Sequence, residues 1–344
     1  SENAADAIGS ITIDGLGSKI LVSSANTSSR ELISANSRGD AGAGAISLQN
    51  ADNIILNNVK VTSQTSSVGD AGDIIISNFS IDDSTGQVIV PTEVPVDIPS
   101  ISLTGDTTVS ASSTSSSTGN AGSVLIHGGS VGVNASTLSS ATDNEGNAGS
   151  VAVKAAFGGI NIENGSLISS STNGSGDTIG DAGSVSLGAT NGLTTISGVV
   201  GSETRIESSS NTSTSGSAGN VNIIGAGDTI NDNVVINTAT ESSKSGNVAA
   251  SITIDGQGNE INIQSLGSSP QEVITASTNG STNAGSIIIQ NASNIVIDNV
   301  NIESQTKADG SAGNIGIYGS DISVDGATIT SSTDNTGHAG QVTL

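Results

Sequence analysis

The sequence has 344 residues, of which 45 are glycine, only three are aromatic, and none is cysteine, methionine or tryptophan. Its 32 acidic and 8 basic residues give a formal net charge of −24, which excludes nucleic acid as a partner because the phosphate backbone would be repelled. No apolar run approaches the ~18 residues of a membrane-spanning helix, and without cysteine there are no disulfides. Because β-branched residues are common and aliphatic residues are evenly spread, the composition predicts an all-β fold rather than a disordered linker.

In chain order, the first predicted strand lies in the sequence SITIDG at Ser10–Gly15, where isoleucine alternates with polar residues. The same six residues return at Ser251–Gly256, and the similarity continues beyond them without a gap. We interpret residues 10–76 and 251–317 as duplicated blocks of several repeats each. Such copying is typical of solenoids, in which each repeat contacts chiefly its neighbours.

A shorter unit, marked by an Ala-Gly pair, recurs along the whole chain. The glycines of these pairs are Gly44, Gly72, Gly122, Gly149, Gly183, Gly219, Gly285, Gly313 and Gly340. Their spacings of 28, 50, 27, 34, 36, 66, 28 and 27 residues indicate a basic repeat of 27–28 residues, with two double intervals and two extended loops. Two or three strands per repeat, joined at glycine-rich corners, predict a single right-handed parallel β-helix over residues 1–344. At this repeat length the chain would make about 12 coils.

Within each repeat, aliphatic residues alternate with polar ones, which places the aliphatic side chains on the inner face. The expected core residues include Ile54, Ile126, Val151, Ile160, Ile223 and Ile295. The Ser/Thr tracts that close the repeats, such as Ser110–Ser117 and Ser169–Thr172, are expected to form irregular outer loops that can be glycosylated. Regular hydroxyl rows would instead favour an ice-binding surface, but the uneven lengths of these tracts argue against it.

One segment departs from the repeat. Residues 84–100 read STGQVIVPTEVPVDIPS and contain three of the four prolines, Pro91, Pro95 and Pro99. Because proline cannot donate to a central strand ladder, we expect an extended, semi-rigid excursion from the rod. Two interpretations stay open: a plain loop insertion, or a docking arm through which these prolines meet a neighbouring subunit.

Candidate catalytic residues are few. Glu203, Arg205 and Glu207 share one face of a strand and predict a surface ion-pair ladder. To act as a catalytic cluster, they would need carboxylates at matching positions of the next coil. However, the residue directly before the Ala-Gly pair is never acidic in two successive repeats. The sequence therefore predicts that the protein is not an enzyme.

Candidate metal ligands are also sparse. The run Gly225–Ile230 is similar to the calcium-binding nonapeptide G-G-x-G-x-D-x-U-x, although calcium sites of that kind are built from tandem copies and this run occurs once. It makes Asp228 and Asp232 candidate calcium ligands, and no other cofactor is expected. Both histidines, His127 and His338, are expected to face solvent, and two are too few for a zinc site.

The repeat has the form G-[DNS]-A-G-x-[IV]-x-[IVL], and the stretch NGSLISSSTNGSG follows one copy at Asn164–Gly176. The G-[DNS]-A-G-x-[IV]-x-[IVL] motif occurs at Gly69–Ile76, Gly119–Ile126, Gly146–Val153, Gly180–Leu187 and Gly216–Ile223. This pattern resembles the repeats of filamentous-haemagglutinin-type exoproteins over most of the chain. The resemblance implies a secreted β-helical rod, exported by two-partner secretion in many family members, that acts at a bacterial surface as an adhesin or matrix fibre. The NPNG-type motifs of that family's secretion domain do not occur in this sequence.

Both ends of the sequence fall within repeats. The strand that contains Ile11 and Ile13 starts almost at once, whereas the last repeat breaks off after Val342, Thr343 and Leu344. We expect these strands to pair head to tail between subunits and to build a homopolymeric fibre. The competing explanation is that the sequence is an excerpt of a longer rod.

These features predict a non-enzymatic structural or adhesive protein at the bacterial cell surface. The alternative is a monomeric adhesin segment that binds surface polysaccharides, or host or abiotic surfaces. The third candidate is a carbohydrate-active β-helix enzyme.

Overall fold

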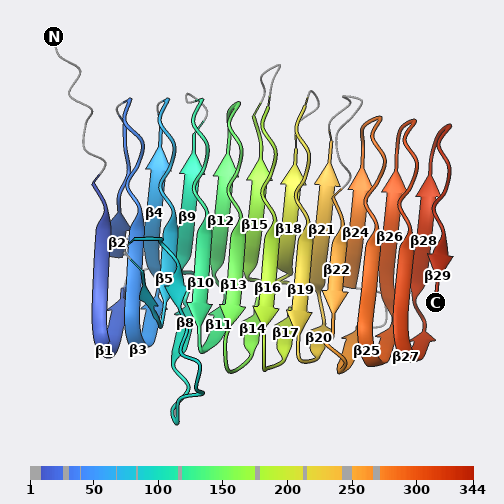
Figure 1. Ribbon diagram of the computed structural model, residues 1–344. Coiled ribbons are helices and arrows are strands. Elements are labelled where there is room, and N and C mark those ends of the chain that lie inside the picture. Colours follow the sequence, from blue (N-terminus) through green and yellow to red (C-terminus); the bar gives the residue numbers. More distant parts are fainter. Residues whose placement is uncertain are drawn as a thin grey trace.

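The computed structural model describes residues 9–344 apart from 26–30, 39, 67, 83, 115–117, 175–178, 212–214, 242–249 and 266–271. The described chain is all β and contains no helix, and hence none long and apolar enough to cross a membrane. Its strands stack in chain order along one axis, and we refer to this stack as the rod (Figure 1). Long parallel sheets in this order are compatible with a β-helical solenoid.

Two parallel sheets contain nearly all the strands. The larger sheet has 17 strands: β1 (Ile11–Ser23), β3 (Ile46–Asn57), β5 (Ile74–Ser77), β8 (Ser100–Thr104), β10 (Val124–Gly128), β11 (Ser130–Asn134), β13 (Val151–Ala155), β14 (Ile160–Glu163), β16 (Val185–Ala189), β17 (Thr194–Ser197), β19 (Val221–Gly225), β20 (Asp228–Asn231), β22 (Ile252–Asp255), β23 (Glu260–Gln264), β25 (Ile287–Asp298), β27 (Ile315–Asp325) and β29 (Val342–Thr343). The smaller sheet has 10 strands: β2 (Glu31–Ser34), β4 (Val59–Thr65), β9 (Thr108–Ser113), β12 (Thr137–Thr142), β15 (Leu167–Thr172), β18 (Thr204–Ser210), β21 (Val234–Thr240), β24 (Glu272–Thr278), β26 (Val300–Thr306) and β28 (Thr328–Thr333). A separate antiparallel pair joins β6 (Ser80–Ile81) to β7 (Val88–Ile89).

Successive repeats are stacked in register. In the larger sheet, Val151 of β13 pairs with Val124 of β10 on one side and with Val185 of β16 on the other. Each repeat in the middle of the chain contributes two strands to the larger sheet and one to the smaller sheet. Similar side chains therefore lie above one another, and every second residue of a strand points inward.

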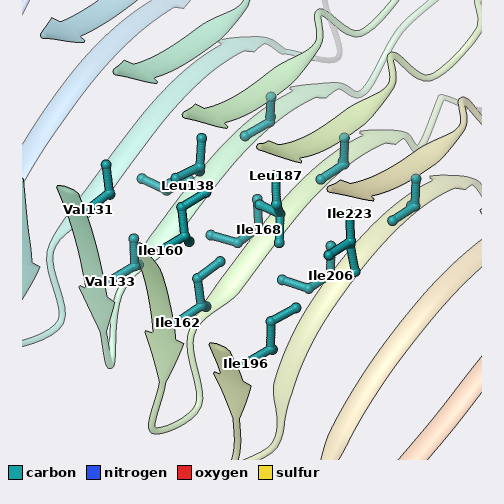
Figure 2. Close-up of a cluster of buried hydrophobic side chains, with 14 of the residues drawn as sticks. Val131, Val133, Leu138, Ile160, Ile162, Ile168, Leu187, Ile196, Ile206 and Ile223 are labelled. Atoms are coloured by element: carbon teal, nitrogen blue, oxygen red, sulfur yellow. The ribbon is translucent and has the colours of Figure 1, made fainter. Parts of the chain in front are cut away.

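The interior is a column of aliphatic side chains enclosed by the two sheets (Figure 2). The six residues predicted to face inward, Ile54, Ile126, Val151, Ile160, Ile223 and Ile295, are each at most 1 % exposed, which confirms that prediction. Isoleucine and valine dominate the column because their branched side chains pack well on a pleated surface.

Serine hydroxyls from the smaller sheet hold the Ala-Gly corners together. The Ser170 hydroxyl donates to the carbonyl oxygen of Gly149 at 2.9 Å and accepts from the N–H of Gly183 at 2.8 Å. It thereby joins the corners of two successive repeats. The same two bonds are made by Ser140, Ser208, Ser304 and Ser331. A Cβ at Gly183 would stand 2.4 Å from the carbonyl oxygen of Gly149, so only glycine allows this approach.

The Ser/Thr tracts form the strands of the smaller sheet, so the expectation that they are irregular outer loops is wrong for their described residues. β9 contains Ser110–Ser113 and β15 contains Ser169–Thr172, whereas residues 115–117 lie outside the described chain. Within β15, Ser170 and Thr172 are fully buried. Hydroxyls are found inside because the backbone at the corners needs hydrogen-bond partners that aliphatic side chains cannot supply.

The duplicated blocks keep the same turn chemistry. In the first block, Asp14 Oδ1 accepts from Asn50 Nδ2 at 2.9 Å, and in the second block Asp255 Oδ1 accepts from Asn291 Nδ2 at 2.9 Å. Both asparagines are in the left-handed region, with φ of 52° and 53°. Asparagine tolerates this conformation better than most residues, which explains why it stands at the same turn in both blocks.

Replacing Ile160 with aspartate should lower the free energy of unfolding by several kcal/mol, because an unpaired carboxylate would be buried between the sheets. The matched control is Asn161→Asp, which puts the same charge on the exposed neighbour in β14. Thermal melts followed by circular dichroism compare the two variants. Equal melting temperatures would contradict the inward position of Ile160.

Candidate functional site

The proline-rich segment forms an arm that leaves the rod after β5 and returns at β8 (Figure 1). We call residues 80–99 the arm. It starts as the β6–β7 hairpin and continues without strand pairing through residues 90–99. Asn78 holds the base of the arm in place. Its Nδ2 donates hydrogen bonds to the carbonyl oxygens of Ala51 at 2.8 Å and of Ser100 at 3.1 Å. The arm is therefore anchored at both ends, and the strands on either side of it keep their register.

An aromatic cluster lies at the base of the arm. The ring of Phe79 meets the ring of His127 edge to face, with centroids 5.5 Å apart, and meets the ring of Phe157 in the same way at 5.9 Å. Phe79 itself is only 5 % exposed. The three rings come from three different repeats and meet only because the repeats stack. Two of the three aromatic residues of the chain are thus gathered at one place.

Of the two histidines, His338 matches the sequence-based expectation fully and His127 matches it in part. His127 is on the outward face of β10, as predicted, but it is half-buried. Burial, together with the nearby positive charge of Lys154, lowers the pKa of His127 to about 4, so the imidazole is neutral at physiological pH. His338 is exposed as expected.

A groove of about 550 Å³ runs between the arm and the larger sheet. Val90 and Pro91 form its arm side, whereas Phe157, Gly188 and Ile224 line it from the rod. Gly188 points outward from β16, and apart from its chain neighbours no atom lies within 4 Å of the position where its Cβ would stand. The missing side chain leaves a hollow in the groove floor. The lining is apolar enough to receive aliphatic side chains.

Lys154 supplies the positive charge of this groove. It is exposed on β13, next to His127 in the stacked register, and it makes no ion pair with any carboxylate that the structure describes. The groove therefore combines apolar walls with one available cation, which suits an apolar ligand that also carries an anionic group. No motif in the sequence marks this site. Its one signal is that Lys154 is the only basic residue between Lys60 and Arg205.

Asp228, a candidate calcium ligand, lies inside the rod. It points inward from β20, is 1 % exposed, and is stacked between Thr194 and Ile261 of the neighbouring repeats. Burial raises the pKa of the Asp228 carboxyl to about 7; the Thr194 hydroxyl opposes this rise and the Asp255 carboxylate adds to it. At neutral pH the carboxyl is thus close to half protonated.

The second calcium candidate, Asp232, lies in the turn after β20 and is half-buried, with a φ of 52°. Within the described ranges, no group of three or more His, Cys, Asp or Glu side chains is placed to hold a metal ion. The two aspartates thus lie in different settings, one in the core and one in a turn.

The predicted ion-pair ladder is confirmed. Arg205 Nη1 lies 2.5 Å from Glu203 Oε1, and Arg205 Nη2 lies 2.7 Å from Glu207 Oε2. All three side chains are at least partly exposed, so the pairs contribute at most about 1 kcal/mol each.

Comparisons of this chain with protein-family models, with curated proteins and with solved structures find no match. The resemblance to haemagglutinin-type repeats therefore rests on the repeat motif alone. The function has to be inferred from the rod, its edges and its groove.

Replacing Asp228 with asparagine should remove a pH-dependent loss of stability. Because the pKa is about 7 in the folded state and 3.8 for the unperturbed group, the folded protein binds more protons between these values, and its stability falls as the pH rises through that window. Asp228→Asn should match the native protein below pH ~4 and exceed its stability by about 4 kcal/mol above pH ~7.

Melting temperatures measured from pH 3.5 to pH 8.5 test this, with Asp232→Asn as the control that removes a charge outside the core. If both substitutions changed the melting temperature equally at every pH, the buried position of Asp228 would be contradicted.

Proposed function

We propose that the protein is a non-enzymatic structural or adhesive rod at the bacterial cell surface. In this proposal the rod is a right-handed parallel β-helix, with one coil for each of the 10 described strands of the smaller sheet, and it lengthens by pairing strands end to end. The predicted count of about 12 coils is too high, because β5 pairs directly with β10 and the 50-residue interval between Gly72 and Gly122 is therefore one repeat with an insertion, not two. The observation that carries the proposal is the repeated pair of serine hydrogen bonds at the Ala-Gly corners. Each such serine links the corner of one repeat to the corner of the next. The extracellular setting is supported by the haemagglutinin-type repeat motif.

A second row of polar side chains also joins the repeats. Asp70 Oδ1 accepts the backbone N–H of Asn120 at 2.7 Å, and Asn120 Oδ1 accepts that of Asn147 at 2.9 Å. The row continues through Asp181 and Ser217, whose N–H groups each bond to the preceding side chain at 2.7 Å. These residues occupy the position before each Ala-Gly pair. Their side chains hold the stack together, which supports a mechanical role for this row.

Both ends of the described rod present strand edges. β1 pairs with β3 alone, β28 with β26 alone and β29 with β27 alone among the described strands. Near these edges, Ile11 and Ile13 are half-buried and Leu344 is 60 % exposed, whereas core residues in mid-rod are fully buried. An edge of this kind accepts a further strand, from more of the same polypeptide or from another subunit.

Deleting Gly340–Leu344 should leave a folded rod that no longer elongates, because the β29 strand at the open edge is lost. Gln341→Ala keeps that strand and serves as the control. Negative-stain electron microscopy would measure rod lengths, after mass spectrometry has fixed the length of the native chain. Filaments of unchanged length from the deletion variant would refute end-to-end pairing, as would a native chain that continues well past Leu344.

A further inference from the structure

We propose that the tip of the arm docks into the groove of a second copy of this chain, so that two rods pair side by side. This contact is separate from end-to-end stacking. It involves the arm and the outer face of the larger sheet between β10 and β19, not the edge strands β1, β28 and β29.

The arm tip, residues 93–98, presents aliphatic side chains to solvent. Val96 is fully exposed, Val94 is 64 % exposed and Ile98 is 44 % exposed. Elsewhere along the rod, aliphatic residues are mostly in the core. A cluster of exposed aliphatic residues on a projecting segment marks a contact surface for another macromolecule.

The chemistry of the arm tip matches that of the groove. Glu93 and Asp97 flank the exposed valines, and the groove offers the unpaired ammonium group of Lys154 beside apolar walls. Docking would bury the valines against Phe157 and Ile224 and bring a carboxylate to that cation. Because the chain has 32 acidic and 8 basic residues, an available cation next to an apolar groove is uncommon on its surface. This complementarity identifies the arm of another copy as the occupant.

The position of the arm favours reciprocal exchange. Val90 and Pro91 belong to the arm and also form one side of the groove, so the two surfaces are adjacent. From Pro91 to Val96 the chain can span at most about 17 Å, which keeps the tip close to its own groove. A two-fold rotation that places one tip in the partner's groove therefore places the partner's tip in the first groove. Such a contact closes on itself and yields a dimer.

The prolines of the arm reduce the cost of docking. Pro91, Pro95 and Pro99 each fix one backbone angle, so less chain entropy is lost when the tip is held. Proline also lacks an N–H group, so the tip is poorly suited to adding a strand to a sheet. Recognition would thus depend on its side chains.

Cysteine cross-linking tests the contact directly, because the chain has no cysteine of its own. We would mix a Val96→Cys chain with a differently tagged Gly188→Cys chain under mild oxidation. Gly188 has open space for the new side chain, so the fold should be unchanged. The expected result is a disulfide-linked pair that carries both tags. The control is Gly132→Cys on β11, where the backbone oxygen of Ile101 is 4.0 Å from the new Cβ and no arm is expected to dock. Cross-linking no faster at Gly188 than at Gly132 would overturn the proposal.

Charge reversal gives a second, independent test. In sedimentation velocity at about 5 to 200 µM, where a small interface associates, the native chain should shift from 33.4 kDa towards twice that mass. Lys154→Glu should weaken pairing at least tenfold, and adding Glu93→Lys and Asp97→Lys to the same chain should restore it. Lys60→Glu reverses an exposed lysine on the smaller sheet and is the control. Equal effects of the two lysine reversals, or no rescue, would contradict the proposed docking.

Discussion

At the Ala-Gly corners the backbones of successive repeats come closer than any side chain allows. A Cβ on Gly122, Gly149, Gly183, Gly219, Gly313 or Gly340 would stand only 2.2 to 2.4 Å from a carbonyl oxygen of the preceding corner. The approach leaves backbone groups that need partners inside the rod, and an inward serine hydroxyl supplies both a donor and an acceptor. The close approach at the glycine corners and the serine hydrogen bonds together fix the distance between successive repeats. At that distance the aliphatic side chains of the core stack in register. The strands, the outer polar ladder and the groove all depend on that spacing.

The same constraint explains why the rod tolerates insertions. Because each repeat is held by its immediate neighbours, a loop between strands can lengthen without disturbing the stack. The arm is the largest example among the described residues: β5 still pairs with β10, and β8 still pairs with β11, on either side of it. Insertion is therefore a route by which a mechanical scaffold can gain a binding surface. The groove exists only where the arm lies beside the sheet.

Much of the fold could be predicted from local patterns, since alternation of aliphatic and polar residues fixes which residues face inward. The pattern is uninformative where both faces carry hydroxyls: nothing local distinguishes Ser170, bonded at a corner, from its outward neighbour Ser171. For Asp228, alternation indicates the correct inward position, because Ile230 lies two residues further along the same inward face. The similarity to a calcium-binding motif instead suggested that Asp228 is a metal ligand. The cluster of Phe79, His127 and Phe157 was beyond sequence reasoning, since it requires the exact register of three repeats and the path of the arm.

Amide hydrogen exchange at single corners tests the central role of the serine bonds most directly. In Ser170→Ala, the N–H of Gly183 loses its partner, whereas that of Gly149 keeps its bond to Ser140. A buried bond worth about 1–3 kcal/mol corresponds to exchange at Gly183 that is faster by roughly fivefold or more, with Gly149 as the internal reference. Unchanged exchange at Gly183, or equal acceleration at both glycines, would show that the corners are held by something other than these hydroxyls.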